Sequence, residues 1–228
     1  MSAIVELKGV SKAYTRGKER LPVLRNISLD IEQGDFVALM GPSGSGKTTL
    51  LNLIGGIDAP TEGTVQVAGS HLESLSSTEL AKFRAANIGF VFQFYNLLPV
   101  LTAQRNVELP LLLTKLNRSQ RAKNATTALK VVGLEDRASH RPGELSGGQQ
   151  QRVAIARAIV ADPKVLVCDE PTGDLDRETA DEILKLLELL NQEHGKTIVM
   201  VTHDPKAASH ARHILQLDKG QLVNGAAA

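Results

Sequence analysis

The 228-residue sequence has a single cysteine, almost no net charge and no long apolar run. One cysteine excludes an intramolecular disulfide and gives no sign of an oxidising compartment. With 26 basic and 25 acidic residues, the net charge of +1 argues against nucleic-acid binding, which normally requires a basic excess. No segment approaches the roughly 18 consecutive apolar residues of a membrane-spanning helix, and the first residues lack a secretory signal pattern. These absences predict a soluble, intracellular globular chain.

Two kinds of strand pattern are present. Ile4–Val10 and Val23–Ile31 alternate between apolar and polar residues, as half-buried antiparallel strands do, and the polar segment Thr15–Arg20 between them is expected to form a hairpin loop. Other runs are continuously apolar and rich in β-branched residues, which is typical of central parallel strands covered on both faces. These runs are Phe36–Met40, Val165–Cys168 and Thr197–Val201.

Helical patterns alternate with the apolar runs, so the sequence predicts an α/β fold with a mostly parallel central sheet and an N-terminal antiparallel β subdomain. The helical patterns are Thr48–Ile54, Gly147–Val160 and Glu178–Glu193. Residues 94–161 have helix-forming composition, above all Arg118–Val132, and no convincing strand, which predicts a helical subdomain inserted between 1–93 and 162–228. Ile214–Leu217 and Gln221–Val223 are expected to form a small hairpin.

A glycine-rich segment follows the first apolar run. It reads Gly41-Pro42-Ser43-Gly44-Ser45-Gly46-Lys47-Thr48 and is followed by a helical pattern that begins with Thr49, the context that the phosphate-binding motif G-x-x-x-x-G-K-[ST] requires. Glycines let successive backbone N–H groups surround phosphate oxygens at a helix N-terminus. Lys47 is then expected to reach the β- and γ-phosphates, and the Thr48 hydroxyl to coordinate Mg²⁺.

Two acidic residues end the second apolar run. In a parallel sheet, ligands bind at the carboxyl ends of the strands, where Asp169 and Glu170 are placed. Asp169 is expected to hold Mg²⁺ and Glu170 to act as general base on the attacking water. Both acids would pass as ordinary strand-end residues if they stood alone, and the phosphate-binding motif upstream favours the catalytic interpretation. Cys168 is interpreted as a small buried hydrophobe.

The segment Leu145-Ser146-Gly147-Gly148-Gln149 precedes a helical pattern, and Ser146 is a favourable N-cap. A capped helix start with bare glycines is an anion site and is expected to meet a phosphate. Together with the two motifs above, this segment matches the signature of the ATP-binding cassette (ABC) ATPases. The chain therefore resembles an ABC ATPase over nearly its whole length.

The resemblance implies roles for further residues. Tyr14 matches the aromatic residue that stacks on adenine, Gln93 the Q-loop glutamine that touches Mg²⁺, and His203 the switch histidine at the γ-phosphate. Asp176 belongs to the D-loop Gly173–Asp176 at the dimer interface. The resemblance also implies a Mg²⁺-dependent ATPase that works as a homodimer. In it, Ser146 and Gly148 of one copy face the γ-phosphate bound by the other.

Further segments resemble the lipoprotein-releasing and macrolide-exporting branch of the family. They are Leu53–Asp58, Phe92–Pro99, Asn106–Leu111 and His140–Pro142. The resemblance implies a permease on a separate chain and a place on the cytoplasmic face of the bacterial inner membrane. Phe94–Pro99 is either core packing or a docking cleft for that permease. A regulatory cassette that signals through a membrane partner to cell-wall enzymes stays open as the alternative, whereas a P-loop kinase or GTPase has no use for the segment at Ser146.

Overall fold

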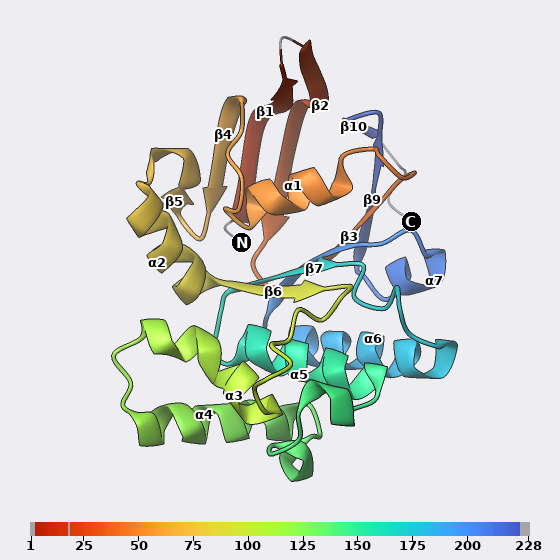
Figure 1. Ribbon diagram of the computed structural model, residues 1–228. Coiled ribbons are helices and arrows are strands. Elements are labelled where there is room, and N and C mark those ends of the chain that lie inside the picture. Colours follow the sequence, from red (N-terminus) through yellow and green to blue (C-terminus); the bar gives the residue numbers. More distant parts are fainter. Residues whose placement is uncertain (1–2, 18, 224–228) are drawn as a thin grey trace.

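Two sheets, with one helix between them, form the upper part of the molecule in Figure 1. The structure is a computed structural model that describes residues 3–17 and 19–223, so residues 1, 2, 18 and 224–228 lie outside the described part. The first sheet is antiparallel in the order β2-β1-β4-β5, which confirms the predicted N-terminal β unit. Its strands are β1 (Ala3–Arg16), β2 (Glu19–Glu32), β4 (Glu62–Val67) and β5 (Ser70–His71).

The central sheet is mostly parallel, as predicted. Its order is β10-β9-β3-β8-β7-β6, and only β10 pairs in the antiparallel direction. The strands are β3 (Phe36–Met40), β6 (Ile88–Phe92), β7 (Val165–Asp169), β8 (Thr197–Val201), β9 (His213–Asp218) and β10 (Gln221–Val223). Because β3, β7 and β8 run in the same direction, their carboxyl ends meet at one edge, and this edge carries the candidate site.

One helix lies between the sheets and most of the others cover the opposite face of the central sheet (Figure 1). The segment 94–161 contains helices and short 3₁₀ turns but no strand, as its composition predicts. The helices are α1 (Lys47–Ile54), α2 (Ser77–Asn87), α3 (Ala103–Glu108), α4 (Arg118–Val131), α5 (Gly147–Ile159), α6 (Arg177–Gln192) and α7 (Pro205–Ala208). Within the described ranges, no helix combines the length and the apolar composition needed to cross a bilayer.

The central strands are continuously apolar because both faces are covered. Along β7, Val165 and Val167 pack with α1 and the antiparallel sheet, whereas Leu166 and Cys168 pack with the helical layer. All four side chains are buried, and each apolar side chain of this size stabilises the fold by roughly 1.5–3 kcal/mol. Burial also raises the pKa of the Cys168 thiol to about 12, which agrees with its interpretation as a buried hydrophobe.

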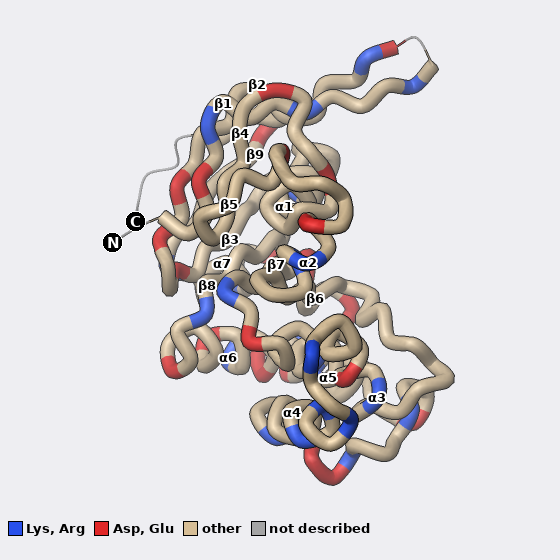
Figure 2. Tube along the Cα trace, turned by 90° about the vertical axis from the view of Figure 1, so that its left-hand side faces the viewer, with Lys and Arg blue, Asp and Glu red and all other residues tan. Residues whose placement is uncertain are grey.

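Two sequence-based expectations are corrected by the strand pairing. Thr15–Arg20 is not simply a loop, because Thr15 pairs with Arg20 and Arg16 with Glu19, so that a two-stranded ribbon projects from the molecule (Figure 2). Its outer part lacks a buried face, and the alternation of apolar residues therefore stops before the strands do. The C-terminal hairpin is also more than a small appendage, since Ile214 pairs in parallel with Ala38 and β9 belongs to the central sheet.

Candidate functional site

The loop between β3 and α1 has a backbone that only glycine adopts easily. Gly41, Gly44 and Gly46 have φ angles of 156°, 78° and 102°, values that favour residues without a side chain. A Cβ on Gly41 would lie 2.0 Å from the backbone oxygen of Leu217. Gly46 is the N-cap of α1 and offers no side-chain acceptor, so the first amides of the helix remain available to an anion.

The turn between β9 and β10 packs against this loop. The Gly220 N–H donates to the Ser45 carbonyl at 3.1 Å, and the Gly220 carbonyl accepts from the Arg25 N–H at 2.8 Å. A Cβ on Gly220 would lie 2.2 Å from the backbone oxygen of Val23. The C-terminal hairpin is therefore packed tightly between the phosphate loop (residues 41–48) and β2.

Lys47 is a nearly buried cation without an anionic partner. The side chain is 9% exposed, and its Nζ donates to the backbone oxygens of Gly41 at 2.7 Å and Pro42 at 3.0 Å. Among the described residues, no carboxylate lies within ion-pair distance of it. Neutral carbonyls compensate a desolvated charge only in part, so the position favours the arrival of an anion such as a phosphate.

Thr48 and Asp169 meet at the start of α1. The Thr48 hydroxyl donates to the Asp169 Oδ1 at 3.3 Å. Burial and the negative charge of Glu170 raise the pKa of the Asp169 carboxyl. A hydroxyl and one carboxylate beside a phosphate loop fit Mg²⁺, which proteins bind through one or two carboxylates together with substrate phosphates.

Glu170 and His203 form a hydrogen-bonded pair opposite the phosphate loop. The His203 Nδ1 lies 2.9 Å from the Glu170 Oε1. Glu170 has a φ of 48°, and its N–H donates to the Val201 carbonyl at 2.9 Å. A non-glycine residue in this region of φ costs about 1–3 kcal/mol and persists only where the surroundings fix it. The Glu170 side chain lines the same cavity as Lys47 and Thr48 of the phosphate loop.

Lys47, Thr48, Glu170 and His203 share one open cavity of 660 Å³. It is lined by Val23, Ser43, Gly44, Gly46, Lys47, Thr48, Thr49, Glu170, Val201 and His203. The remaining residues that the sequence assigned to nucleotide or metal binding do not line it. They are Tyr14, Gly41, Ser45, Gln93, Ser146, Gly148, Asp169 and Asp176.

Tyr14 lies on β1 with a ring that is 42% exposed. Its hydroxyl donates to the Asp58 Oδ2 at 2.8 Å, and the Lys12 Nζ lies 4.8 Å from the ring centroid. Lys12 also donates to Asp58 at 2.6 Å. Burial, followed by the hydrogen bond to Asp58, raises the pKa of the Tyr14 hydroxyl. Sequence reasoning missed Lys12 and Asp58, although Lys12 is two residues from Tyr14 and so lies on the same face of the strand.

Ser146 and Asp176 cap helices of their own chain. The Ser146 Oγ accepts from the Gln149 N–H at 3.2 Å at the start of α5. Asp176 accepts from the Thr179 N–H at 3.1 Å at the start of α6, and the hydrogen bonds from Thr179 lower the pKa of its carboxyl. Gly148 faces α6, because a Cβ there would lie 2.3 Å from the Thr179 Cγ2. The two helix starts are thus packed side by side.

Gln93 is held by the D-loop. Its Nε2 donates to the Asp174 Oδ1 at 3.1 Å, and a Cβ on Gly173 would lie 3.0 Å from the Gln93 Cδ. The two loops that follow β6 and β7 are therefore in direct contact. This bond to Asp174 is a second contact that sequence reasoning did not find.

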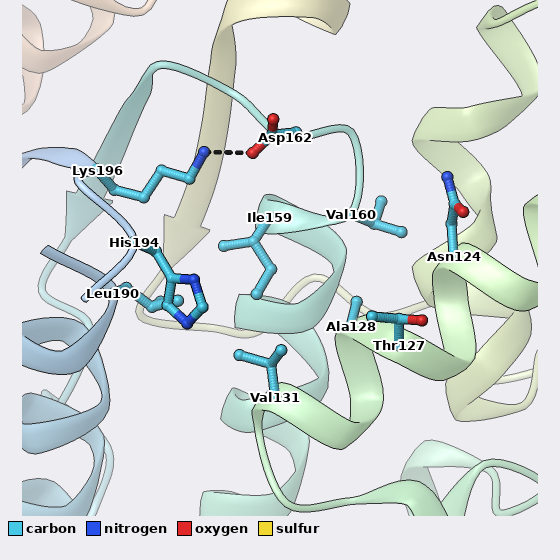
Figure 3. A pocket seen from close by; sticks show the side chains of 10 residues that line it. All are labelled: Asn124, Thr127, Ala128, Val131, Ile159, Val160, Asp162, Leu190, His194 and Lys196. Atoms are coloured by element: carbon cyan, nitrogen blue, oxygen red, sulfur yellow. Dashed lines mark hydrogen bonds and ion pairs between the residues drawn. The ribbon is translucent and has the colours of Figure 1, made fainter.

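A second cavity lies at the opposite edge of the central sheet, and Figure 3 shows the side chains that line it. It has a volume of 320 Å³ and includes Asp162 before β7 and Lys196 before β8. These two side chains form an ion pair. Since both precede their strands, the cavity is at the amino edge and is separate from the phosphate loop.

A comparison with known protein families decides the assignment. Residues 24–173 match the family model described as ABC transporter. This chain belongs to the ABC transporter family. The cassette is 47% identical over 223 residues to the lipoprotein-releasing system ATP-binding protein LolD of Geobacter metallireducens, covering 98% of the chain and 99% of that protein. It is 51% identical over 222 residues to the macrolide export ATP-binding/permease protein MacB of Rhodopirellula baltica, covering 96% of the chain and 32% of that protein.

Among solved structures, the cassette resembles the dimeric post-hydrolysis state of the ATP-binding cassette MJ0796 bound to ADP and Pi, a protein of Methanocaldococcus jannaschii. The TM-score is 0.87 at 48% identity, with 96% of each chain covered. These relatives confirm the predicted resemblance to the lipoprotein-releasing and macrolide-exporting branch of the ABC ATPases.

Proposed function

We propose that this cassette is the ATP-binding and ATP-hydrolysing subunit of a membrane transporter, which it powers by dimerising around Mg-ATP. The observation that carries the proposal is the distribution of the site. Lys47, Glu170 and His203 line the phosphate cavity, whereas Ser146 and Gly148 of the same chain lie outside it. A second copy supplies the missing surface.

In the proposed reaction, the phosphate loop binds the phosphates of ATP through its backbone N–H groups, and Lys47 moves from the loop carbonyls to the β- and γ-phosphates. Thr48, Asp169 and Gln93 would hold Mg²⁺, which would neutralise charge on the phosphate oxygens. Glu170 accepts a proton from the attacking water.

The residues around this core orient the substrate. His203 holds the Glu170 carboxylate and contacts the γ-phosphate, and Tyr14 stacks on the adenine. Asp176 lies at the interface with the second copy, where it fixes the start of α6.

The proposed homodimer places Ser146 and Gly148 of one copy on the γ-phosphate held by the other. The dimeric state of the related MJ0796 cassette with ADP and Pi supports this arrangement. Hydrolysis removes the phosphate that both copies contact and so opens the dimer. ATP binding thereby closes the dimer and hydrolysis opens it.

The permease is proposed to be a separate chain that docks beside Gln93. A groove of 370 Å³ is lined by parts of α2, β6 and α5 and by Leu113. Leu113, which lines the groove, is 75% exposed. Phe94, the residue after Gln93, is 69% exposed, whereas Leu97 packs against the core. We therefore assign Leu97 to packing and the exposed apolar side chains to docking of an apolar segment of the permease.

The proposed subdivision keeps residues 1–93 and 162–228 as the catalytic unit and 94–161 as the helical unit that carries Ser146. The proposed location is the cytoplasmic face of the membrane, where ATP is available. The names of the LolD and MacB relatives support lipoprotein release or macrolide export as the kind of work. Export of antimicrobial peptides is proposed beside them on the resemblance of the sequence to that branch alone.

The decisive experiment compares the wild type with Glu170→Gln. The wild type is expected to convert Mg-ATP to ADP and phosphate. The variant is expected to lose nearly all turnover, to retain ATP binding, and to elute as a dimer with Mg-ATP and as a monomer without it. Full hydrolysis by a strictly monomeric wild type, with Ser146→Ala equally active, contradicts the proposal. Recovery of an integral membrane protein together with the cassette, purified from membranes, tests the proposal that the permease is a separate chain.

A further inference from the structure

Gln151 is a completely buried polar residue near the start of α5. Its Nε2 donates to the backbone oxygen of Pro171 and, at 3.3 Å, to the backbone oxygen of Phe92. Its Oε1 is buried as well and accepts no hydrogen bond within the described part of the chain. One amide group thus joins the helix that begins at Ser146 to two strand ends.

The two carbonyls that Gln151 holds adjoin catalytic positions. Phe92 is the residue before Gln93, and Pro171 is the residue after Glu170. Proline has no backbone N–H, so the carbonyl of Pro171 is its only hydrogen-bonding group. Because Glu170 has a positive φ, contacts on either side must hold it in place. The bond from Gln151 is one of them.

Stability of the helix does not explain the amide. A methionine has a similar length and shape and would leave no buried Oε1 without a partner. Replacing both partners of a buried hydrogen bond by apolar groups can be nearly neutral, whereas removing only the Gln151 amide leaves the buried Pro171 carbonyl without its donor, at a cost of about 1–3 kcal/mol. A glutamine at this position is therefore better explained by what its N–H groups hold than by packing.

A second residue of α5 holds the same segment. Arg157 donates to the backbone oxygens of Asn96 and, at 2.8 Å, of Tyr95. Gln151 and Arg157 together tie α5 to the chain on both sides of Gln93. Only Gln151 also reaches the segment after Glu170.

We infer that Gln151 is a positioning residue for ATP hydrolysis. It makes the positions of Glu170 and Gln93 depend on the position of the helix that begins at Ser146. When the γ-phosphate of the ATP bound by the second copy contacts Ser146, it moves or fixes α5. Through its two hydrogen bonds, Gln151 then moves or fixes the carbonyls of Phe92 and Pro171 in the same way. The inference rests on the proposed function, since it requires hydrolysis and a second copy.

The test compares Gln151→Met with a matched control. Asn191 on α6 also donates to two backbone carbonyls, those of Gly34 at 2.7 Å and Lys196 at 2.8 Å, at the amino edge of the sheet. Asn191→Leu therefore removes an equivalent bridge away from the phosphate loop. Gln151→Met is expected to lower kcat about 10- to 100-fold, the usual effect of losing a residue that orients a catalytic group. The KM for ATP is expected to stay within about twofold, and Asn191→Leu to keep wild-type kcat.

A double-variant comparison separates positioning from general damage. If Gln151 acts through Glu170, adding Gln151→Met to Glu170→Gln lowers the residual turnover no further, and the Mg-ATP dimer of Glu170→Gln persists. Should Gln151→Met not fold, Gln151→Asn takes its place, because its amide is one methylene too short to reach both carbonyls.

Two results overturn the inference: a kcat of Gln151→Met within about twofold of the wild type, or the same fractional loss in the Glu170→Gln background. A wild type and an Asn191→Leu variant that fail to hydrolyse ATP would instead refute the proposed function itself.

Discussion

Gly148 is expected to be required for packing as well as for access of a phosphate. An alanine in a helix normally stabilises it by roughly 0.5–1 kcal/mol relative to glycine. Here the added Cβ would lie 2.3 Å from the Thr179 Cγ2. Thr179 cannot turn away freely, since its Oγ1 donates to the Asp176 Oδ2 at 2.6 Å. Gly148→Ala is therefore expected to lower the free energy of unfolding by about 1–3 kcal/mol, the usual cost of overpacking.

Thr179→Ser provides a specific rescue. It removes the methyl group that the new Cβ would meet and keeps the hydroxyl that bonds to Asp176. The next contacts of a Cβ at Gly148 are 3.7 and 3.9 Å away, which is ordinary van der Waals distance. In the Thr179→Ser background, Gly148→Ala is thus expected to cause no loss and to raise the free energy of unfolding by up to about 1 kcal/mol, the preference of a helix for alanine over glycine.

Denaturant unfolding of the four combinations, with Gly143→Ala as control, measures this coupling. A Cβ on Gly143 meets nothing within 4 Å, so this control is expected to stay within about 0.5 kcal/mol of the wild type. An equal loss for Gly148→Ala in both backgrounds would refute the packing argument. ATP hydrolysis by the rescued double variant then reports the second requirement alone, which is the bare amide surface that we propose contacts the phosphate bound by the other copy.

Three further predictions concern the nucleotide and the partner. Lys47→Ala is expected to weaken ATP binding about 10- to 100-fold, since charge-assisted bonds contribute roughly 1.5–3 kcal/mol, and calorimetric titration measures it. The same change should leave the unfolding midpoint of the nucleotide-free protein nearly unaltered, because Lys47 has no anionic partner there. Tyr14→Ala is expected to cost about 1–3 kcal/mol of ATP affinity through lost stacking, and Tyr14→Phe much less; equal losses would contradict stacking. Leu113→Asp is expected to abolish recovery of the membrane partner while leaving ATP hydrolysis intact, whereas Leu189→Asp, an exposed leucine on α6, retains both.

The local motifs were predictable because each is defined by neighbouring residues. The strand Phe36–Met40, its glycine loop and the helix after it lie together in the sequence, and the structure gives β3 the predicted bounds. The same holds for β8 at Thr197–Val201. The apolar runs reveal burial on both faces, and burial on both faces defines a central strand.

Pairing between remote segments was not predictable from one sequence. β9 joins the central sheet by pairing with β3, which lies far away in sequence, and no local pattern distinguishes it from an isolated hairpin. The strand β6 at Ile88–Phe92 was missed because it contains Gly89, which usually weakens a strand. Here a Cβ on Gly89 would lie 2.4 Å from the Ala158 carbonyl, so the glycine permits close contact with α5.

The contacts within the site were also hidden. Nothing in the sequence distinguishes Gln151 from an ordinary glutamine in a helix, and only the fold places it between Phe92 and Pro171. The hydrogen bond between Gln93 and Asp174 joins loops that are 81 positions apart. The residue types of the site were therefore predictable, whereas their orientation depends on tertiary contacts that a sequence pattern does not contain.

The contact between Gly220 and Ser45 has a consequence for biosynthesis. The ribosome synthesises the phosphate loop early, but the turn between β9 and β10 that is hydrogen-bonded to its backbone is synthesised almost 180 residues later. A nascent chain that has not yet exposed Gly220 lacks the hydrogen bond to Ser45. Such a chain is therefore expected to bind nucleotide more weakly than the finished protein.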